Sequence, residues 1–302
     1  METKIQLEGS LRDTTIIYSC ELKEALEYHK IVENEVGKLK ADDNAMKLLF
    51  RLYLSIPKIK AIQIDMRDSS GKIDAGTIIN ETSSFKVLVN LSGGLDSTVL
   101  LYYLMRKGAE VHAISFNYGS KHNDIEIKHA EKICEKLGIS HQTISLDFIN
   151  KCFKSDLLQN GGEIPEGHYA AENMKSTVVP FRNGIFYSIS AGLAESYNCD
   201  FIALASHAGD HTIYPDCRGE FTQSMYNSIR LGTEKGIQLI APFNKISKTD
   251  IVKIGNELNV DFSSTYSCYK GKEKHCGKCG TCIERKEAFQ ESNVMDPTTY
   301  EE

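Results

Sequence analysis

The sequence predicts an α/β fold, a doubly wound parallel sheet that is preceded by a small α+β domain and followed by a metal-binding lobe. Three observations indicate this architecture. Short apolar runs alternate with amphipathic segments from residue 85 onward, a glycine turn follows the first run, and four cysteines cluster near the C-terminus. Strands that alternate with helices form parallel sheets that are covered on both faces. We therefore expect a ligand at the carboxyl ends of the strands, where the glycine turn lies.

The length allows one large domain or two, since a domain has about 150 residues and the chain has 302. We expect an α+β domain over residues 1–84 and the main domain over residues 85–302. In the first domain, the pattern predicts strands at 15–18 and 61–65 and helices at 22–38 and 43–54. The run Asp68-Ser69-Ser70-Gly71 predicts a turn that joins two strands as a hairpin. This domain contains no chemical motif that we recognise.

Periodicity and bounding residues predict each element of the main domain. The expected strands are 85–90, 110–116, 141–145, 201–205 and 238–241, and the expected helices are 98–104, 127–137, 183–196, 220–231 and one that begins at Ser247. Gly108 ends the first helix, and Gly138 takes the C-terminal cap of the second. Ser247 and Asp250 have nearly the spacing of a capping box. Residues 155–180 contain glycine and proline without a sustained period, which predicts a long loop over the site.

The charge balance favours a small-molecule substrate. The chain has 35 basic and 41 acidic residues and a net charge of −6 at pH 7. Proteins that bind nucleic acid through its phosphates usually present a dominant basic face, so nucleic acid is not expected as a partner. No apolar run approaches the roughly 20 residues of a membrane span, and no basic segment followed by an apolar one opens the chain. We expect a cytoplasmic protein without a membrane partner.

The glycine turn is the most informative motif. Ser92-Gly93-Gly94-Leu95-Asp96-Ser97 follows the apolar run 85–90 directly and opens a helix. Two adjacent glycines bring backbone N–H groups against an anion beside the positive end of the helix, which favours a bound phosphate. In the Walker pattern a lysine ends the loop, whereas here the acid Asp96 stands in its place, which implies a bridging Mg²⁺. A turn that contains glycine for steric reasons alone is the alternative.

Four of the nine cysteines have the spacing of a metal site. They place four thiolates within reach of one tetrahedral ion, and they are Cys268, Cys276, Cys279 and Cys282. We expect a C-terminal zinc-binding lobe over residues 268–282. Since four protein ligands leave no open position on Zn²⁺, its expected role is to hold this lobe together. An iron–sulfur cluster and four reduced thiols without metal are the alternatives, and a colourless protein would favour zinc.

The hexapeptide of the glycine turn resembles the SGGxDS loop of the ATP pyrophosphatases, which cut ATP between its α- and β-phosphates and have an adenine nucleotide alpha-hydrolase-like fold. Further stretches extend this likeness from about Phe85 to Phe289 and make the chain similar to the QueC family. They are Pro180–Asn183, Tyr214–Arg218, Ser267–Tyr269 and, after the cysteines, Glu284–Phe289. The first 84 residues lie outside the usual family pattern.

The resemblance implies a ligase of queuosine biosynthesis that adenylates its substrate twice. ATP activates the carboxylate of 7-carboxy-7-deazaguanine, and ammonia then displaces AMP to give an amide. A second ATP activates the amide oxygen, and loss of AMP leaves the nitrile of 7-cyano-7-deazaguanine. The resemblance also implies a homodimer.

Candidate site residues combine the motif with the resemblance. The expected nucleotide-binding residues are Leu91, Ser92, Gly93, Gly94, Leu95, Asp96, Ser97 and Thr98. Asp96, Ser97 and Lys248 are the expected catalytic residues, because fixed donors and a cation stabilise the charge that develops on the phosphates. An ordinary surface lysine at a helix start is the alternative for Lys248.

Four loop residues are expected to recognise the base and the carboxylate of the substrate, namely Arg182, Asn183, Asp216 and Arg218. An acid accepts hydrogen bonds from a guanine-like edge, and an arginine holds a carboxylate with two parallel hydrogen bonds. An ion pair between Asp216 and Arg218 that only ties down its loop is the alternative. The rings of Phe116 and Tyr118 either stack on adenine or close the core.

A second function stays open, that of a QueC-like ligase that transfers the adenylated deazaguanine carboxylate to a protein amine, as in antiviral defence. Residues 1–84 motivate it, because an added module would dock a protein acceptor, whereas free ammonia requires no docking surface. A third reading is a nucleotide-binding protein without activity, and the complete loop with Asp96 argues against it.

Overall fold

The computed structural model describes residues 4–11, 14–21, 61–67, 73–79, 85–244 and 246–301. The chain divides into two compact units, residues 1–85 and residues 86–302. The expected division after residue 84 lies one residue from this one.

The described part of the first unit is a four-stranded antiparallel sheet with the order β1-β2-β3-β4. Its strands are β1 Lys4–Leu11, β2 Thr14–Glu21, β3 Ala61–Arg67 and β4 Ile73–Ile79. The expected strands at 15–18 and 61–65 are confirmed as β2 and β3, and β3 pairs with β4 on either side of the expected turn. The sequence pattern does not predict β1, and it indicates β4 only as the strand that follows the expected hairpin turn. The expected helices at 22–38 and 43–54, and the turn at 68–71, lie outside the described residues.

The second unit is built on a five-stranded sheet with the order β7-β6-β5-β8-β9. Its strands are β5 Phe85–Asn90, β6 Ala109–Asn117, β7 Ser140–Ser145, β8 Phe201–Ala203 and β9 Gln238–Ile240. The pairs β6–β7, β5–β8 and β8–β9 are parallel. Along the chain the strands run outward from β5 to one edge and then from β8 to the other, which is the doubly wound arrangement that the alternation predicts.

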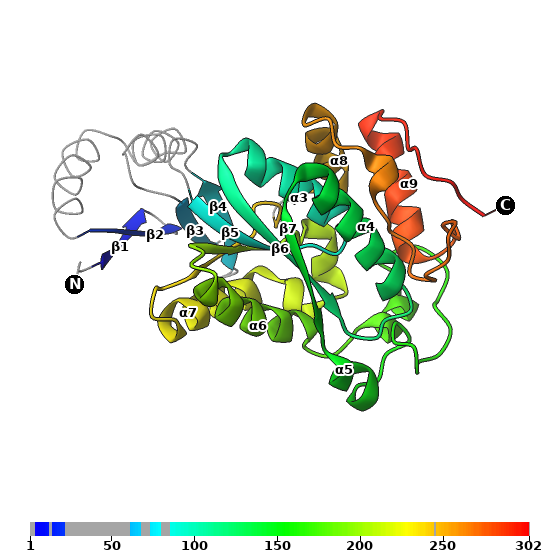
Figure 1. The fold of residues 1–302 in the computed structure, drawn as a ribbon, viewed down its shortest axis with the longest axis horizontal. Coiled ribbons are helices and arrows are strands. Elements are labelled where there is room, and N and C mark those ends of the chain that lie inside the picture. The colour runs from blue at the N-terminus through cyan, green and yellow to red at the C-terminus, as the bar shows by residue number, and fades with distance from the viewer. Residues whose placement is uncertain are drawn as a thin grey trace. The chain divides into compact units, whose positions relative to one another are not determined.

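Helices cover both faces of this sheet (Figure 1). They are α3 Leu95–Arg106, α4 Asn123–Leu137, α5 Asp147–Cys152, α6 Arg182–Ser196, α7 Gly219–Gly232, α8 Lys248–Glu257 and α9 Gly280–Ser292. On one face α3 and α4 pack against β6, with α8 on α3 and α9 on α8; on the other face α6 packs against β8 and α7 against β9. The glycine turn therefore joins a central strand to a helix that is packed between the sheet and α8.

The predicted helix ends are confirmed where a cap determines them. Gly138 has φ +67° and caps α4 in the left-handed conformation. The side chain of Ser247 accepts from the N–H of Asp250 at 3.1 Å, and Asp250 accepts from the N–H of Ser247 at 3.2 Å, which is a complete capping box. The expected loop 155–180 is irregular except for 3₁₀ turns at Glu172–Thr177. The sequence pattern does not predict α5 or α9.

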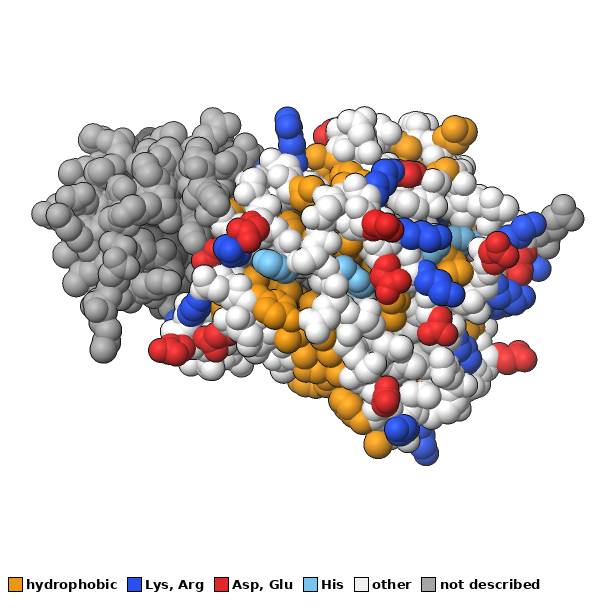
Figure 2. Space-filling model, viewed as in Figure 1, with side chains coloured by type: hydrophobic (Ala, Val, Ile, Leu, Met, Phe, Trp, Pro, Cys, Tyr) orange, Lys and Arg blue, Asp and Glu red, His pale blue; other side chains and the backbone are white. Residues whose placement is uncertain are grey.

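The core lies between the central strands and their helices. Val87, Leu88 and Val89 of β5 and Ile202 of β8 have no measurable exposure, as expected for strands that are covered on both faces. On the visible surface of the second unit, basic and acidic side chains are interspersed without a large patch of one sign (Figure 2). Among the helices in the described ranges, none is long and apolar enough to cross a membrane.

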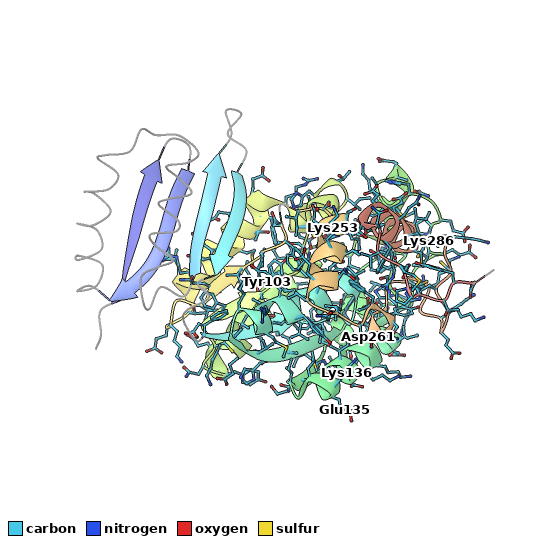
Figure 3. The ribbon with its side chains drawn as sticks, turned by 90° about the horizontal axis from the view of Figure 1, so that it is seen from above. Tyr103, Glu135, Lys136, Lys253, Asp261 and Lys286 are labelled. Carbon is cyan, nitrogen blue, oxygen red and sulfur yellow. The ribbon has the colours of Figure 1, made fainter. Side chains whose placement is uncertain are left out.

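An ion pair at the surface joins α4 to the segment that leads to the cysteines. Nζ of Lys136, at the end of α4, lies 3.0 Å from Oδ2 of Asp261, and the two side chains lie together in Figure 3. This contact stays exposed and contributes little stability, typically about 0–1 kcal/mol. Packing therefore determines the position of α4 next to the glycine loop.

Candidate functional site

A cleft opens at the carboxyl ends of the strands, beside the point where the strand order reverses between β5 and β8. Its walls come from the glycine loop, the end of β6, helices α4 and α6, the segment after β8, and the segment before the cysteines. The cleft holds about 1280 Å³ of space that no protein atom fills, its open mouth included. Polar side chains and aromatic rings line this cleft together, as in sites that bind small molecules.

The glycine loop has a shape that requires glycine at its centre. Gly93 has φ +80°, and a Cβ atom built on it would lie 2.3 Å from the carbonyl oxygen of Glu126 in α4. Oγ of Ser92 accepts from the N–H of Gly94 at 3.1 Å, and Oγ of Ser97 accepts from the N–H of Ser92 at 3.2 Å. These bonds hold the loop in one conformation, and Gly93 lies directly against the first two turns of α4.

Helix α3 begins at this loop with an open first turn. Gly94 is the N-cap residue and supplies no side-chain acceptor to the turn. The N–H groups of a first turn lack intrahelical partners and carry the positive end of the helix dipole, so they favour an anion. Of the expected nucleotide-binding residues, those that line the cleft are Leu91, Ser92, Gly94, Leu95, Asp96 and Ser97. Thr98 is buried and donates its hydroxyl to the carbonyl of Gly94 at 2.7 Å.

Asp96 and Lys248 lie together at the start of α3. Nζ of Lys248 is 3.1 Å from Oδ2 of Asp96 and 2.8 Å from Oε2 of Glu284, and only 9% of this lysine side chain is exposed. Burial opposes the charge of the ammonium, but Asp96 and Glu284 outweigh it and raise the pKa of Lys248. Lys248 is thus a buried residue of the cleft and not a surface lysine. The sequence reasoning did not assign a role to Glu284, although it lies in a stretch that carries the family resemblance.

The second carboxylate oxygen of Asp96 is suited to a cation. Oδ1 is buried and has no hydrogen-bond partner in the described part of the chain. A buried carboxylate oxygen without a donor is costly, and Mg²⁺ takes carboxylate and phosphate oxygens as ligands. The carboxylate of Asp96 therefore fits as a ligand of a Mg²⁺ ion.

Three further polar side chains, those of His207, Asp210 and Tyr169, are connected to Lys248 through Glu284. Nε2 of His207 is 3.6 Å from Oδ1 of Asp210 and 3.7 Å from Oε1 of Glu284. Tyr169 donates to Oδ1 of Asp210 at 2.9 Å. Burial opposes the charge of Asp210, but His207 and the neighbouring donors outweigh it and lower the pKa of this carboxyl. Asp210 therefore lines the cleft as a carboxylate that its neighbours already hold.

Arg182 enters the cleft among aromatic rings. Its guanidinium lies 5.9 Å from the ring centre of Tyr118 and 5.7 Å from that of Phe186. Phe116 stacks on Phe186 with ring centres 4.2 Å apart. All of these side chains line the cleft, so the aromatic residues of the 116–118 stretch pack against one another and also form a wall of the site.

Of the four expected recognition residues, Arg182 and Asn183 line the cleft, whereas Asp216 and Arg218 lie outside its walls. Oδ2 of Asp216 accepts from the backbone N–H of Asn183 at 2.8 Å, so this buried carboxylate holds the start of α6. Arg218 is exposed and donates from Nε to the carbonyl of His211 at 3.1 Å. The structure thus brings two of the four to the cleft and gives Asp216 a positioning contact.

Helix α4 adds two polar residues that the sequence reasoning did not identify, His122 just before it and Glu126 in its first turns. Both line the cleft, and Nε2 of His122 lies 3.5 Å from Oε2 of Glu126. Residues four positions apart share one face of a helix, so the spacing is a signal that the sequence does contain. The sequence analysis did not use this spacing, because the apolar residues of the same segment already identify it as a helix.

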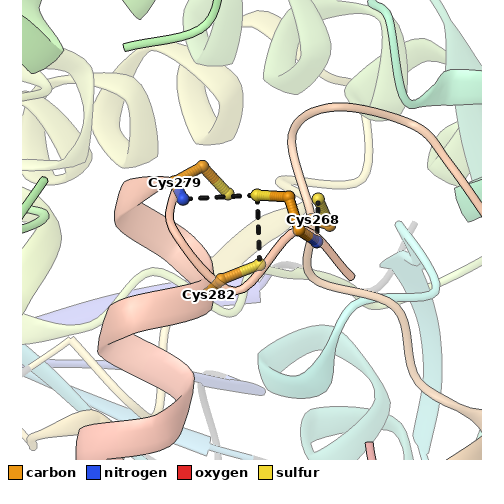
Figure 4. A group of neighbouring side chains, drawn as sticks. Cys268, Cys279 and Cys282 are labelled. Carbon is orange, nitrogen blue, oxygen red and sulfur yellow. Dashed lines mark hydrogen bonds between the residues drawn. The ribbon is translucent and has the colours of Figure 1, made fainter. Parts of the chain in front are cut away.

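The four cysteines form a compact buried cluster. All four Sγ atoms lie within 4.8 Å of one another, and Sγ of Cys276 is 4.0 Å from Sγ of Cys282. Two thiolates bound to one tetrahedral Zn²⁺ at about 2.3 Å are separated by about 3.8 Å, so the geometry fits such an ion. The side chains of Cys268, Cys279 and Cys282 converge beside the start of α9 in Figure 4. The cluster therefore has the donor set and the spacing of a closed metal site.

A buried arginine supports this lobe. Arg285 of α9 has no measurable exposure, and its Nε lies 3.2 Å from Oδ1 of Asp296. It also donates to Oγ1 of Thr265 at 2.8 Å and to the carbonyl of Phe262 at 3.1 Å. These bonds tie α9 to the segment that leads to the first cysteine.

Comparisons with known proteins match the second unit. The family model "Queuosine biosynthesis protein QueC" matches residues 86–293. A 7-cyano-7-deazaguanine synthase of Porphyromonas gingivalis is 52% identical over 214 residues, which are 71% of this chain and 96% of the relative. A relative of the same name from Desulfotalea psychrophila is 50% identical over 70% of this chain and 97% of its own length. One from Methanoregula boonei is 48% identical over 72% of this chain and 99% of its own.

Proposed function

Because the chain belongs to the QueC family and is an ATP-dependent carbon–nitrogen ligase, we propose that it converts 7-carboxy-7-deazaguanine and ammonia to 7-cyano-7-deazaguanine. The observation that carries the proposal is the cleft, where an open helix start behind a glycine loop faces a buried lysine and an acid. A carboxylate oxygen is a poor leaving group, and bonding it to the phosphate of AMP makes it a good one. Two such steps remove both oxygens and leave a nitrile.

ATP binds in this proposal with its phosphates on the glycine loop. The N–H groups of the first turn of α3 and the hydroxyl of Ser97 donate to the phosphate oxygens, and Lys248 lies beside them. Donors that are already in place act most strongly where charge develops, here on the α-phosphate and on the departing pyrophosphate. Asp96 would hold Mg²⁺ through Oδ1, and the bound ion would neutralise phosphate charge.

The deazaguanine substrate lies next to the α-phosphate in this proposal. Arg182 holds its carboxylate, because a guanidinium offers two parallel donors to a carboxylate. Asn183 contacts the base, and Asp216 acts through the N–H of Asn183, which it keeps in place. Arg218 has no substrate contact in the proposed complex.

The remaining assignments concern the lobe and the assembly. The four cysteines hold Zn²⁺ and keep α9 next to the segment before it. The enzyme acts as a cytoplasmic homodimer in this proposal, an assembly that its family resemblance supports. Residues 1–84 lie outside the family match, and docking of a protein acceptor on them belongs to the alternative reaction.

The test incubates the full chain with ATP, Mg²⁺, 7-carboxy-7-deazaguanine and ammonium chloride and identifies the products by mass spectrometry. The expected products are the nitrile, with two AMP and two pyrophosphate for each nitrile. Deazaguanine mass that is found only on a protein amine would instead support the alternative transfer reaction. Formation of no AMP at all would contradict both. Asp96→Asn is expected to stop AMP formation while the protein stays folded and keeps its metal.

A further inference from the structure

The proposed reaction requires a base in the cleft. A nitrile nitrogen carries no hydrogen, so all four hydrogens of ammonium have to leave. One leaves as ammonium becomes ammonia, one after the nitrogen has added to the acyl adenylate, and two as the amide becomes the nitrile. Nothing is oxidised or reduced in these steps, so every hydrogen leaves as a proton. A positioned base that accepts such protons usually contributes about 10²–10⁴-fold in rate.

We propose that Glu126 is this base and that it removes protons from the reacting nitrogen. This inference rests on the proposed function. In the first half of the reaction the carboxylate takes a proton from ammonium and passes it to solvent, and the nitrogen lone pair bonds to the carbonyl carbon. The carboxylate then takes a second proton from the added nitrogen, and the bond from carbon to the oxygen of AMP breaks with its electron pair. In the second half the carboxylate takes one proton from the nitrogen once the amide oxygen is adenylated and passes it to solvent, and it takes the last proton from the resulting imidate nitrogen while AMP departs and the triple bond forms.

The position of Glu126 beside the glycine loop supports this assignment. Its own carbonyl oxygen would lie 2.3 Å from a Cβ atom on Gly93, so the first turns of α4 touch the loop. Side chains on a helix lean toward its N-terminus, and the carboxyl of Glu126 indeed reaches back to His122 along the cleft wall. In an acyl adenylate one oxygen atom separates the reacting carbon from the α-phosphorus. The nitrogen therefore attacks next to the loop, in the cleft that Glu126 also lines.

The other carboxylates of the cleft are already held by donors. Three carboxylates line the cleft within the described ranges, namely Asp96, Glu126 and Asp210. Asp96 lies 3.1 Å from the ammonium of Lys248. Asp210 accepts from Tyr169 at 2.9 Å and from the N–H of His207 at 3.1 Å. A carboxylate that is stabilised by donors or cations is a weak base, so Glu126 is the carboxylate best suited to take a proton.

The groups around Glu126 determine the pKa of its carboxyl. The titratable groups that face it are His122 before α4, Arg182 of α6, Tyr118 after β6 and Tyr266 of the segment before the cysteines, and the ring of Tyr269 packs on His122. Burial raises the pKa of Glu126 to about 8, with Arg182 acting against the rise. Burial and Arg182 lower the pKa of His122 to about 3, so this imidazole is neutral and does not hold Glu126 in an ion pair. A base whose pKa lies near the working pH transfers protons most efficiently.

The test compares Glu126→Gln with Glu135→Gln. The first substitution keeps the shape of the side chain and removes the base, and the second changes an exposed glutamate of the same helix that points into solvent in Figure 3. For Glu126→Gln we expect carboxylate-dependent pyrophosphate release in the first adenylation within about threefold of wild type, since that step removes no N–H proton. We expect amide and nitrile formation to fall about 10²–10⁴-fold. Hydroxylamine, which is unprotonated at neutral pH, should restore carbon–nitrogen bond formation as the hydroxamate, and Glu135→Gln should behave as wild type.

Nitrile formation by Glu126→Gln at the wild-type rate would overturn the assignment, and so would an equal loss of activity with ammonium and with hydroxylamine. A wild-type protein that releases no pyrophosphate with this carboxylate would overturn the proposed function instead, which is a different result. A measurement without substrate tests the base directly. Because the folded pKa of Glu126 lies above the unfolded value of about 4.3, wild type should lose stability relative to Glu126→Gln as pH rises from about 5 to 8. A melting-temperature difference that does not change with pH would contradict the assignment.

Discussion

Replacing Gly93 by alanine tests whether the glycine loop needs both its backbone conformation and its close contact with α4. Gly93 has φ +80°, where a residue with a Cβ atom costs roughly 1–2 kcal/mol. Gly108, at the other end of α3, has φ +81° and no atom within 4 Å of its Cβ position. Gly108→Ala therefore measures the conformational cost alone and is the matched control.

At Gly93 the added methyl group would also lie 2.3 Å from the carbonyl oxygen of Glu126 and 2.8 Å from the amide nitrogen of Ala130. Both are backbone atoms of α4, so no side chain can rotate away, and either the loop or the helix has to move. Overpacking of this kind costs roughly 1–3 kcal/mol, which brings the total for Gly93→Ala to roughly 2–5 kcal/mol. At roughly 2–4 °C per kcal/mol, Gly108→Ala should lower Tm by about 2–8 °C and Gly93→Ala by about 4–20 °C.

The decisive assay is ATP binding by calorimetry, measured together with thermal melting. Gly108→Ala should bind ATP like wild type. Gly93→Ala should lose affinity at least tenfold, because the displaced amides no longer converge on the phosphates. If the two variants melt at the same temperature and bind ATP equally well, the proposed contact between loop and helix is wrong.

Three further predictions concern buried groups. Lys248→Met removes the ammonium between Asp96 and Glu284 and should cost about 3–5 kcal/mol in denaturant unfolding while AMP formation falls; unchanged stability would contradict the buried ion pairs. Cys279→Ser should lower bound metal, measured by mass spectrometry, together with Tm, and full metal content would refute the structural site. Arg285→Met breaks buried bonds of α9 and should lower Tm while ATP affinity stays within about threefold; a selective loss of ATP binding would instead indicate a role in the cleft.

The elements that the sequence predicts correctly are those with a local signal. The strand at 85–90 and the helix ends at Gly138 and Ser247 each depend on residues that are neighbours in the chain. Helix α9 lacks such a signal, because most of its positions are polar and its buried residues include Arg285. It is stabilised by packing against α8 and by the cysteine cluster at its start. Helix α5 has only six residues, which is too short for a period to be recognised.

The residues expected to recognise the substrate also lack a local signal that would show which of them face the cleft. Arg182 and Asp216 both lie in stretches that carry the family resemblance, yet one enters the cleft and the other turns to the backbone of Asn183. Loop residues of one motif can point in opposite directions, and because a loop has no regular period, the sequence does not predict which way each side chain points. The role of Glu126 depends on a contact between α4 and the glycine loop, which brings together two segments that are separate in sequence.

The sequence by itself determined the order of the five strands of the second unit, the glycine loop, the four cysteines and the likeness to the QueC family, because each of these is a local pattern of spacing or conformation. Only the tertiary structure decided that Lys248 is buried between Asp96 and Glu284 and that Glu126 faces the cleft. The physical reason is that burial and distance set the energy of a charge. Both quantities arise when distant segments pack, and a charged residue considered in the sequence alone is expected at the surface.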